Sequence, residues 1–354
     1  MKRNAFLLLS VLLASITASA QTEGTRYCLP KTEMRFQILV EKTTYTPGEY
    51  AAYSERFLKK TESEQPSTSY NIVGVKMYTT AIPDTAKSYV VPVDKKHTIF
   101  NVELDRNGVL LAINTKAKAT AEPEVFTPAP KDKPLNPRDF MSEDILAAGS
   151  VAKMAELTAR EIYDIRNSRS ELTRGEAEYM PKDGDQLKIM LANLDRQEKI
   201  LLQMFQGVTE KDTVEHEIVY CPKGNASDGS AKEEEDDILF RFSQKLGLVD
   251  ADDLAGAPYR LNIEDLKTIP ELHTAVDGEK PSKDATGIMV NMPGKIKATL
   301  TAGNRTVSAF ELYAAQYGRL ELLSDNLFGK KMITKLRLNP ITGYVELLET
   351  EPLD

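Results

Sequence analysis

Two short motifs in this 354-residue sequence have the spacing of serine acyl-transfer chemistry. Ser150 and Lys153 form the Ser-x-x-Lys motif of penicillin-binding enzymes, in which the serine is the nucleophile. Residues 324–326, Ser-Asp-Asn, fit the second motif of those enzymes, but the third motif, Lys-Thr-Gly, does not occur in the sequence. Ser-x-x-Lys alone is a weak signal, because it is expected about once by chance in a chain of this length. We therefore expect no acyl-enzyme chemistry at Ser150.

Sequence patterns that bind metals or nucleotides do not occur either. The histidines, His97, His216 and His273, are isolated, and the sequence has no His-Glu-x-x-His motif, Walker loop or dinucleotide-binding glycine motif. The acidic run 233–237 lacks the alternate spacing and the glycine of a calcium loop, so we interpret it as a solvated loop. We predict no metal and no cofactor. Paired carboxylates for glycan hydrolysis stay open, because their spacing is spatial rather than sequential.

Composition limits the classes of partner. Asp and Glu number 53 against 45 Lys and Arg, a net charge of −8, so binding of nucleic acid by bulk charge is not expected. The chain has no tryptophan, the best stacking residue for sugars, although its 14 tyrosines could substitute. A protein or glycan partner of unknown identity is therefore expected.

The candidate binding site is a polar connection between two predicted helices. Loops held on rigid arms commonly carry function, and this one presents charged and aromatic side chains. A plain polar connection is the alternative. The residues chosen as the binding candidates are Arg174, Glu176, Glu178 and Tyr179.

Residues 139–207 form the predicted helical hairpin that would position this tip. Ser142 is the expected cap of the first helix, and the second is expected to start at Asp185 and end at Gly207. Arg166 and Arg169 would face Asp195 and Glu198 as solvated pairs that contribute little. The inward stripes are Ile145, Val151, Ala155, Ile162 and Ile165 in the first helix, and Leu187, Leu191, Leu194, Leu201 and Phe205 in the second.

Alternating apolar residues on both sides of this hairpin predict strands. Residues 21–138 form an N-terminal β unit that ends in a proline-rich connection, and residues 208–354 form a C-terminal β unit. A hairpin is expected at Asn107-Gly108, and another across 339–343, where Gly343 suits positive φ. The fold class is therefore α+β: two mainly antiparallel β units with a long αα-hairpin between them.

One short helix is expected to interrupt the first β unit. Thr46 would cap it, Pro47 would occupy its first turn, and Glu49 would complete a capping box. Tyr50, Tyr53 and Phe57 then fall on one face of the helix. The stripe could stack on a ligand, but packing of the helix on the sheet is the favoured interpretation.

The first twenty residues indicate export. Lys2 and Arg3 precede an apolar run, and small residues end at Ala20, so residues 1–20 are predicted to be a signal peptide and Gln21 the mature N-terminus. The run is too short to span a bilayer, and no second one follows, so no transmembrane segment is expected after cleavage. Cys28 lies too far from the cleavage site for a lipid anchor. We expect a periplasmic, cell-surface or secreted protein, with a net charge of −10 after cleavage.

The two cysteines, Cys28 and Cys221, could form one disulfide in an oxidising compartment. Such a bridge would close a very long loop and contribute at most about 5 kcal/mol. Two separate thiols are the alternative.

Several strings together resemble a family of exported proteins of unknown function from Bacteroidetes-type bacteria. The resemblance covers about Tyr27 to Glu349 and implies export and the order β, helical pair, β. It implies no catalytic residues. The strings are Tyr45–Tyr53, the helical pair with Asp183-Gly184 before Leu187, Leu239–Ser243, Leu327–Lys331 and the closing hairpin.

The sequence thus favours an exported, non-enzymatic binding or scaffolding protein of the cell envelope, with an unknown ligand. An unrecognised hydrolase acting on envelope glycans or peptides is the first alternative. A subunit of an envelope assembly is the second.

Overall fold

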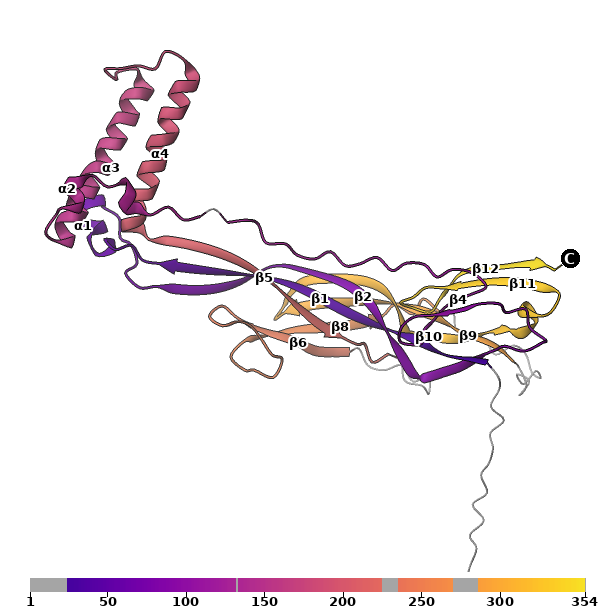
Figure 1. Cartoon of the computed structure of the whole chain (residues 1–354). Helices are drawn as coiled ribbons and strands as arrows, with labels where there is room; N and C mark the ends of the chain where they lie inside the picture. Colours follow the sequence, from indigo (N-terminus) through magenta and orange to yellow (C-terminus); the bar gives the residue numbers. More distant parts are fainter. Residues whose placement is uncertain (1–23, 132, 225–234, 270–285, 354) are drawn as a thin grey trace, which may run out of the picture.

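The computed structural model describes residues 24–131, 133–224, 235–269 and 286–353. In these ranges three antiparallel sheets form an elongated body, and two long helices stand at one end of it (Figure 1). The prediction of an α+β fold with antiparallel sheets is confirmed. The predicted signal peptide, residues 1–20, and His273 lie outside the described residues, as does the acidic run up to residue 234.

A three-stranded sheet, in the order β2-β1-β5, runs along the body. Its strands are β1 (Gly24–Thr46), β2 (Ser67–Pro92) and β5 (Val208–Tyr220). The 23 residues of β1 span roughly 75 Å at about 3.3 Å per residue. Alternate residues of β1, Met34, Phe36, Ile38 and Val40, are buried on the inner face, as strand periodicity requires.

A five-stranded sheet, in the order β10-β9-β8-β6-β7, packs against that inner face. The two sheets enclose the largest hydrophobic core, to which Phe240, Leu261 and Leu300 also belong. The body is therefore a β-sandwich in its central part. The five strands are β6 (Glu235–Ser243), β7 (Gly247–Val249), β8 (Ala257–Asp265), β9 (Gly287–Ala302) and β10 (Arg305–Ser324).

A four-stranded sheet, in the order β12-β11-β4-β3, lies at the end of the body away from the helices (Figure 1). Both predicted hairpins are confirmed here: β3 pairs with β4 around Gly108 at φ 82°, and β11 pairs with β12 around Gly343 at φ 72°. The 3₁₀ turn Asp325–Phe328 precedes β11. The strands are β3 (Val102–Leu104), β4 (Leu110–Ile113), β11 (Met332–Leu338) and β12 (Val345–Pro352).

Two of the three sheets combine strands from both predicted β units. Strand β5 pairs with β1 along thirteen residue pairs, and β11 pairs with β4. The ladders of β1 and β4 are therefore extended by strands that follow the helices in sequence. The helical segment is an insertion into a shared β body rather than a spacer between two separate ones.

The helical end contains α3 (Val151–Arg174) and α4 (Gly184–Gln206), which lie side by side (Figure 1). Ser150 Oγ and Asp183 cap their N-termini by accepting from the backbone N–H of Lys153 and Gln186. The predicted first helix is divided. Residues 147–150 separate a short α2 (Glu143–Leu146) from α3, because the Ser150 cap starts a new helix.

The short helix near residue 46 starts later than predicted. Strand β1 continues to Thr46, and a 3₁₀ turn (Ala51–Tyr53) leads into α1 (Ser54–Leu58). The chain before it is held by α4, since the Tyr50 N–H donates to the Met204 carbonyl at 2.6 Å. The Tyr50 ring packs against Phe205 at 5.4 Å between centroids. The aromatic stripe therefore packs on helices, not on the sheet as predicted.

The described parts of the proline-rich connection, residues 114–131 and 133–136, run back along the outside of the body to the helices, where the 3₁₀ turn Pro137–Phe140 begins (Figure 1). The Gln37 side chain of β1 donates to the Glu124 carbonyl at 3.2 Å, and Lys131 pairs with Asp212 of β5 at 3.0 Å. This extended connection, which we call the strap, therefore lies on the outer face of the three-stranded sheet.

Tyr27 ties β1 to β9, and we expect its replacement by phenylalanine to lower the free energy of unfolding by about 1–3 kcal/mol. Its hydroxyl donates to the Met289 carbonyl at 3.0 Å and accepts from the Met289 N–H at 2.8 Å. Burial raises the pKa of Tyr27, so the hydroxyl keeps the proton it donates. Urea unfolding of Tyr27→Phe measures the loss. An unchanged midpoint would show that water replaces both bonds.

Candidate functional site

The serine motifs have structural roles. Ser150 is the cap of α3, and the Lys153 ammonium pairs with Glu156 at 3.0 Å rather than with Ser150. Ser324 accepts from the Asn326 N–H at 3.3 Å in the turn after β10. Ser150 lies in the helical end and Ser324 in the β body, so the structure does not bring the two motifs together (Figure 1).

The described histidines are also dispersed. His97 Nδ1 lies 2.7 Å from Asp94 Oδ1 in an exposed turn, and His216 lies in β5 opposite Ile38. Within the described ranges, no group of three or more His, Cys, Asp or Glu side chains could hold a metal ion. Asp236 and Asp237, the described end of the acidic run, pair with Arg260 and Lys223.

Cys28 and Cys221, both in described segments, are not joined by a disulfide. The Cys221 sulfur lies 3.7 Å from the Gln316 amide, which also binds the backbone of Thr32. Thr32 is about 13 Å from Cys28 along β1, by the strand rise of about 3.3 Å per residue. A disulfide requires Cα atoms about 4.4–6.8 Å apart, so the strand geometry keeps the two cysteines apart.

The predicted binding residues lie at the tip between α3 and α4. Arg174 ends α3 and pairs with Glu176 at 3.1 Å, and both side chains are about 60% exposed. Tyr179 is 81% exposed, and Glu178 is exposed as well. An exposed ion pair of this kind contributes about 0–1 kcal/mol. A binding role for the tip stays a prediction.

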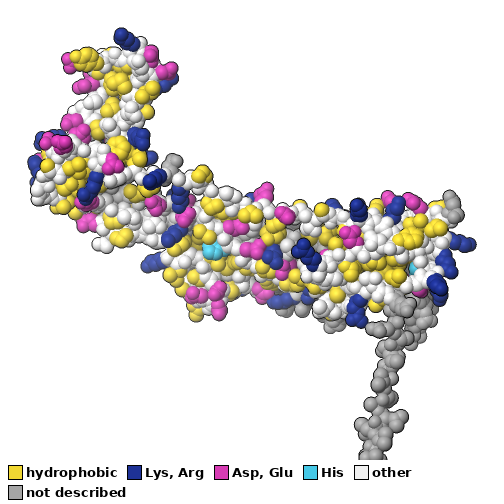
Figure 2. All heavy atoms as spheres, in the orientation of Figure 1, with side chains coloured by type: hydrophobic (Ala, Val, Ile, Leu, Met, Phe, Trp, Pro, Cys, Tyr) yellow, Lys and Arg dark blue, Asp and Glu magenta, His cyan; other side chains and the backbone are white. Residues whose placement is uncertain are grey.

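Charges of both signs are interspersed over the face shown in Figure 2. Two carboxylates on the outer face of the three-stranded sheet bind the same arginine. Arg35 binds Glu33 at 3.0 Å and Glu217 at 2.9 Å. Thr80 also donates to Glu33, and the Tyr78 hydroxyl donates to Glu217, a bond that raises the pKa of Tyr78. Glu33 Oε2 and both oxygens of Glu217 accept from these donors, so the two glutamates form a structural network across three strands.

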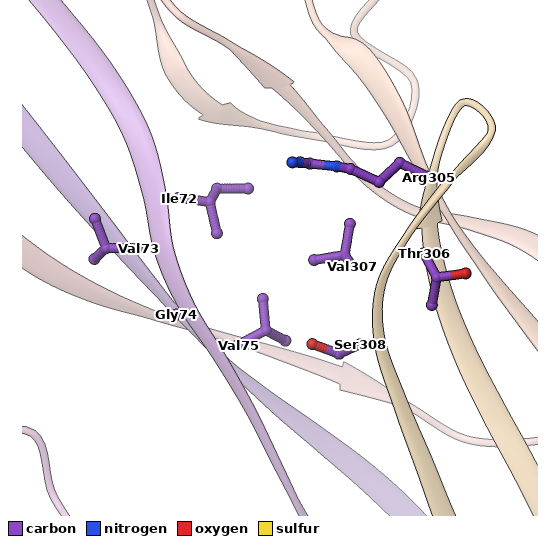
Figure 3. Close-up of a pocket in the computed structure, with 8 residues that line it drawn as sticks. All are labelled: Ile72, Val73, Gly74, Val75, Arg305, Thr306, Val307 and Ser308. Atoms are coloured by element: carbon purple, nitrogen blue, oxygen red, sulfur yellow. The ribbon is translucent and has the colours of Figure 1, made fainter.

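A groove of about 260 Å³ lies between the edges of β2 and β10. Figure 3 shows Ile72, Val75 and Val307 in the space between the two strands, with Arg305 at one end. Each edge has a register shift here, at Val73 in β2 and at Val307 in β10. Bulges and charged side chains are the usual protection of sheet edges against further pairing. The groove therefore separates two protected edges.

A cavity of about 460 Å³ lies where the turn between β11 and β12 meets β9 and β10. Its volume falls within the range of about 300–1,000 Å³ typical of ligand sites. Two tyrosines line it from different elements, and their side chains are 55% and 48% exposed. We call it the aromatic pocket. Its lining residues are Met292, Pro293, Tyr313, Asn339, Thr342 and Tyr344.

Buried Asn291 holds the turn that carries Tyr344. Its side-chain amide donates to the Thr342 carbonyl at 2.9 Å and to the Pro30 carbonyl at 3.1 Å. Its backbone N–H donates to the Gly343 carbonyl at 3.2 Å. Strands β1 and β9 therefore fix the position of the turn, and with it one wall of the pocket.

Strand β10 supplies the other tyrosine. Tyr313 lies opposite Lys295 of β9, immediately before a register shift between Ala314 and Arg319. Pro293 of β9 lies in this region and has no N–H to donate, which suits an interrupted ladder. The interruption opens the space between β10 and the turn 339–344.

Neither Tyr313 nor Tyr344 was predicted from the sequence to be a site residue. A signal for Tyr313 exists, because Phe310, Leu312 and Ala314 alternate toward the core and place Tyr313 on the outer face. Tyr344 follows Gly343, the glycine predicted to lie in the turn. No sequence pattern shows that the two rings line one cavity, since they come from separate hairpins.

Fold and pocket together define an α+β protein with a β-sandwich body, a helical end and a preformed aromatic cavity. Residues 23–346 match the family model described as Domain of unknown function (DUF4831), and the chain belongs to this family. This confirms the predicted resemblance to a family of unknown function. No curated protein and no solved structure matches the chain. Among the described residues, no helix is both long enough and apolar enough to cross a membrane.

Proposed function

We propose that this chain is an exported, non-enzymatic binding or scaffolding protein of the cell envelope. Residues 1–20 act as its signal peptide, and the mature protein carries no lipid anchor. The β body provides a long rigid support, and the helical hairpin, residues 139–207, projects from one end as an arm.

The aromatic pocket is the observation that carries this proposal. Tyrosine presents a large apolar ring and a polar hydroxyl, and both are useful at a site that is partly wet. Tyr313 and Tyr344 are held by separate hairpins, one pinned by the β-ladder and the other by Asn291. A pocket formed before the ligand arrives avoids the entropic cost of ordering loops on binding.

The hydrolase alternative has Glu33 and Glu217 as its best candidates. A glycosidase needs one carboxyl group that delivers a proton and another that attacks or activates water. Arg35 binds both glutamates, and Thr80 and Tyr78 donate to them as well. This arrangement supports a structural role, so binding remains the favoured function.

A thermal-shift screen with glycans, peptides and cell-wall fragments tests the proposal. A ligand at about one hundred times its Kd stabilises the native state by about 2.7 kcal/mol. We expect a ligand that raises Tm for the native chain and fails to do so for Tyr313→Ala/Tyr344→Ala. Phe100→Ala, which removes a 73% exposed ring outside the pocket, should keep the shift.

Two outcomes would contradict the proposal. Chemical turnover of a bound glycan or peptide would favour the hydrolase. Co-purification with envelope proteins at fixed stoichiometry, with no response to any small ligand, would favour an assembly subunit.

A further inference from the structure

The polar side chains of the aromatic pocket are already engaged within the protein. Asn339 Oδ1 accepts from the N–H groups of Ile341 and Thr342 at 3.0 and 2.9 Å, and its Nδ2 donates to Glu346 at 2.9 Å. Thr342 Oγ1 accepts from the Tyr344 N–H at 3.4 Å. Little side-chain hydrogen-bonding capacity is left for a ligand, apart from the tyrosine hydroxyls.

This arrangement disfavours a sugar. Each sugar hydroxyl that leaves water needs a hydrogen-bond partner, and an unmet partner costs about 1–3 kcal/mol. Proline rings have no donors, and the carbonyl groups between them accept from tyrosine hydroxyls. Grooves lined by aromatic rings recognise proline-rich segments in this way, because the extended conformation exists before binding.

The chain displays a segment of this kind on its own surface. Residues 127–131 of the strap, Thr-Pro-Ala-Pro-Lys, are all exposed and lie outside any helix or strand. Two contacts hold the strap near the ends of this stretch. The Gln37 side chain of β1 binds the Glu124 carbonyl of the strap, and Asp212 of β5 pairs with Lys131 of the strap. These two anchors keep the stretch on the sheet of its own chain, while its outer side faces solvent.

We propose that the aromatic pocket of one copy binds the proline-rich strap, residues 127–131, of a second copy. This inference rests on the proposed binding function and names its partner. Pocket and strap are different surfaces, so the contact is head-to-tail, and each copy keeps one pocket and one strap for further neighbours. The protein would thereby form open chains, as suits a scaffold.

Sedimentation velocity of the chain from Gln21 onward tests this inference. We expect the average mass to rise beyond that of a dimer as concentration increases to about 0.1 mM, the range of weak complexes. Tyr313→Ala/Tyr344→Ala removes the pocket rings, and Pro128→Ala/Pro130→Ala removes the strap rings. Each double variant should weaken association at least tenfold, as loss of central aromatic contacts does.

Mixing the two double variants gives the sharper result. The pocket variant keeps its strap and the strap variant keeps its pocket, so one contact can form and growth then stops. We expect a one-to-one complex from the mixture and none from either variant alone. Phe100→Ala and Pro66→Ala, an exposed ring and an exposed proline elsewhere, should associate like the native chain.

A monomer at every concentration would overturn the inference, and so would association that both double variants retain. Binding of a synthetic peptide of residues 121–131 distinguishes failure of the head-to-tail contact from failure of the proposed binding function. The peptide could fail to bind while an N-acetylglucosamine oligomer binds through Tyr313 and Tyr344. In that case the strap of a second copy is not the ligand of the pocket, but the proposed binding function stands. If neither probe binds and no other ligand is found, both proposals fail.

Discussion

Gly343→Ala is expected to lower the free energy of unfolding by about 2–4 kcal/mol and to displace one wall of the aromatic pocket. Gly343 has φ 72°, a region that costs a residue with a Cβ about 1 kcal/mol. An added Cβ would also lie 2.8 Å from the Pro30 ring and 2.9 Å from the Asn291 amide. Overpacking of this kind costs about 1–3 kcal/mol, because neither neighbour can rotate away.

Gly303→Ala is the matched control. Gly303 also has a positive φ, 59°, but a Cβ there would meet no atom within 4 Å. It should therefore lose only about 1 kcal/mol. Urea unfolding of both variants separates backbone strain from the clash. Equal losses would mean that the turn moves away from Asn291 at no cost, and that the pocket wall is not fixed as described.

Local structure could be predicted where neighbouring residues determine it. The turn at Gly343 and the hairpin at Gly108 follow from residues that tolerate positive φ between alternating runs. The pairing of β1 with β5 could not be predicted, because the helical insertion separates these strands and nothing local specifies their partner. The start of the short helix near residue 46 was predicted too early for a similar reason. The chain before this helix is held by the Met204 carbonyl of α4, a contact that a capping pattern cannot anticipate.

In the candidate site too, local features could be predicted from the sequence and long-range contacts could not. The sequence places Tyr313 on the outer face of a strand and Tyr344 after a turn, but their meeting depends on Asn291 and on the interrupted β10 ladder. The binding site chosen from the sequence, the tip between the helices, was selected for exposed charge. Exposed charge is common on surfaces, whereas two aromatic rings around one cavity are a more specific signal.

The burial of Glu198 could have been predicted from the helical periodicity of α4. The inward stripe of α4 runs through Leu194 and Leu201, and Glu198 occupies the position between them. Its side chain is only 10% exposed, and it accepts from Arg166 at 2.6 Å and from Arg169 at 2.9 Å. The prediction of solvated pairs is therefore wrong for Glu198. A carboxylate on a helix's buried face needs partners, and α3 supplies them.

Arg166→Met/Arg169→Met is expected to destabilise the helical end by about 3 kcal/mol. Removing both partners leaves the Glu198 carboxylate buried without a cation, and breaking a buried pair in this way typically costs about 3–5 kcal/mol. Both arginines are about one third exposed, so we expect the lower end of that range. Urea unfolding measures the loss, and hydrogen exchange of α3 and α4 locates it.

Adding Glu198→Leu to this double variant should restore most of the lost stability. The triple variant replaces the ion network by apolar side chains on a face that already carries Leu194 and Leu201, and such replacements are often neutral or stabilising. Rescue would show that the loss comes from an isolated buried charge rather than from the missing arginine side chains. If the triple variant is as unstable as the double variant, the arginines stabilise α3 and α4 mainly by packing their aliphatic stems, and Glu198 is not the cause.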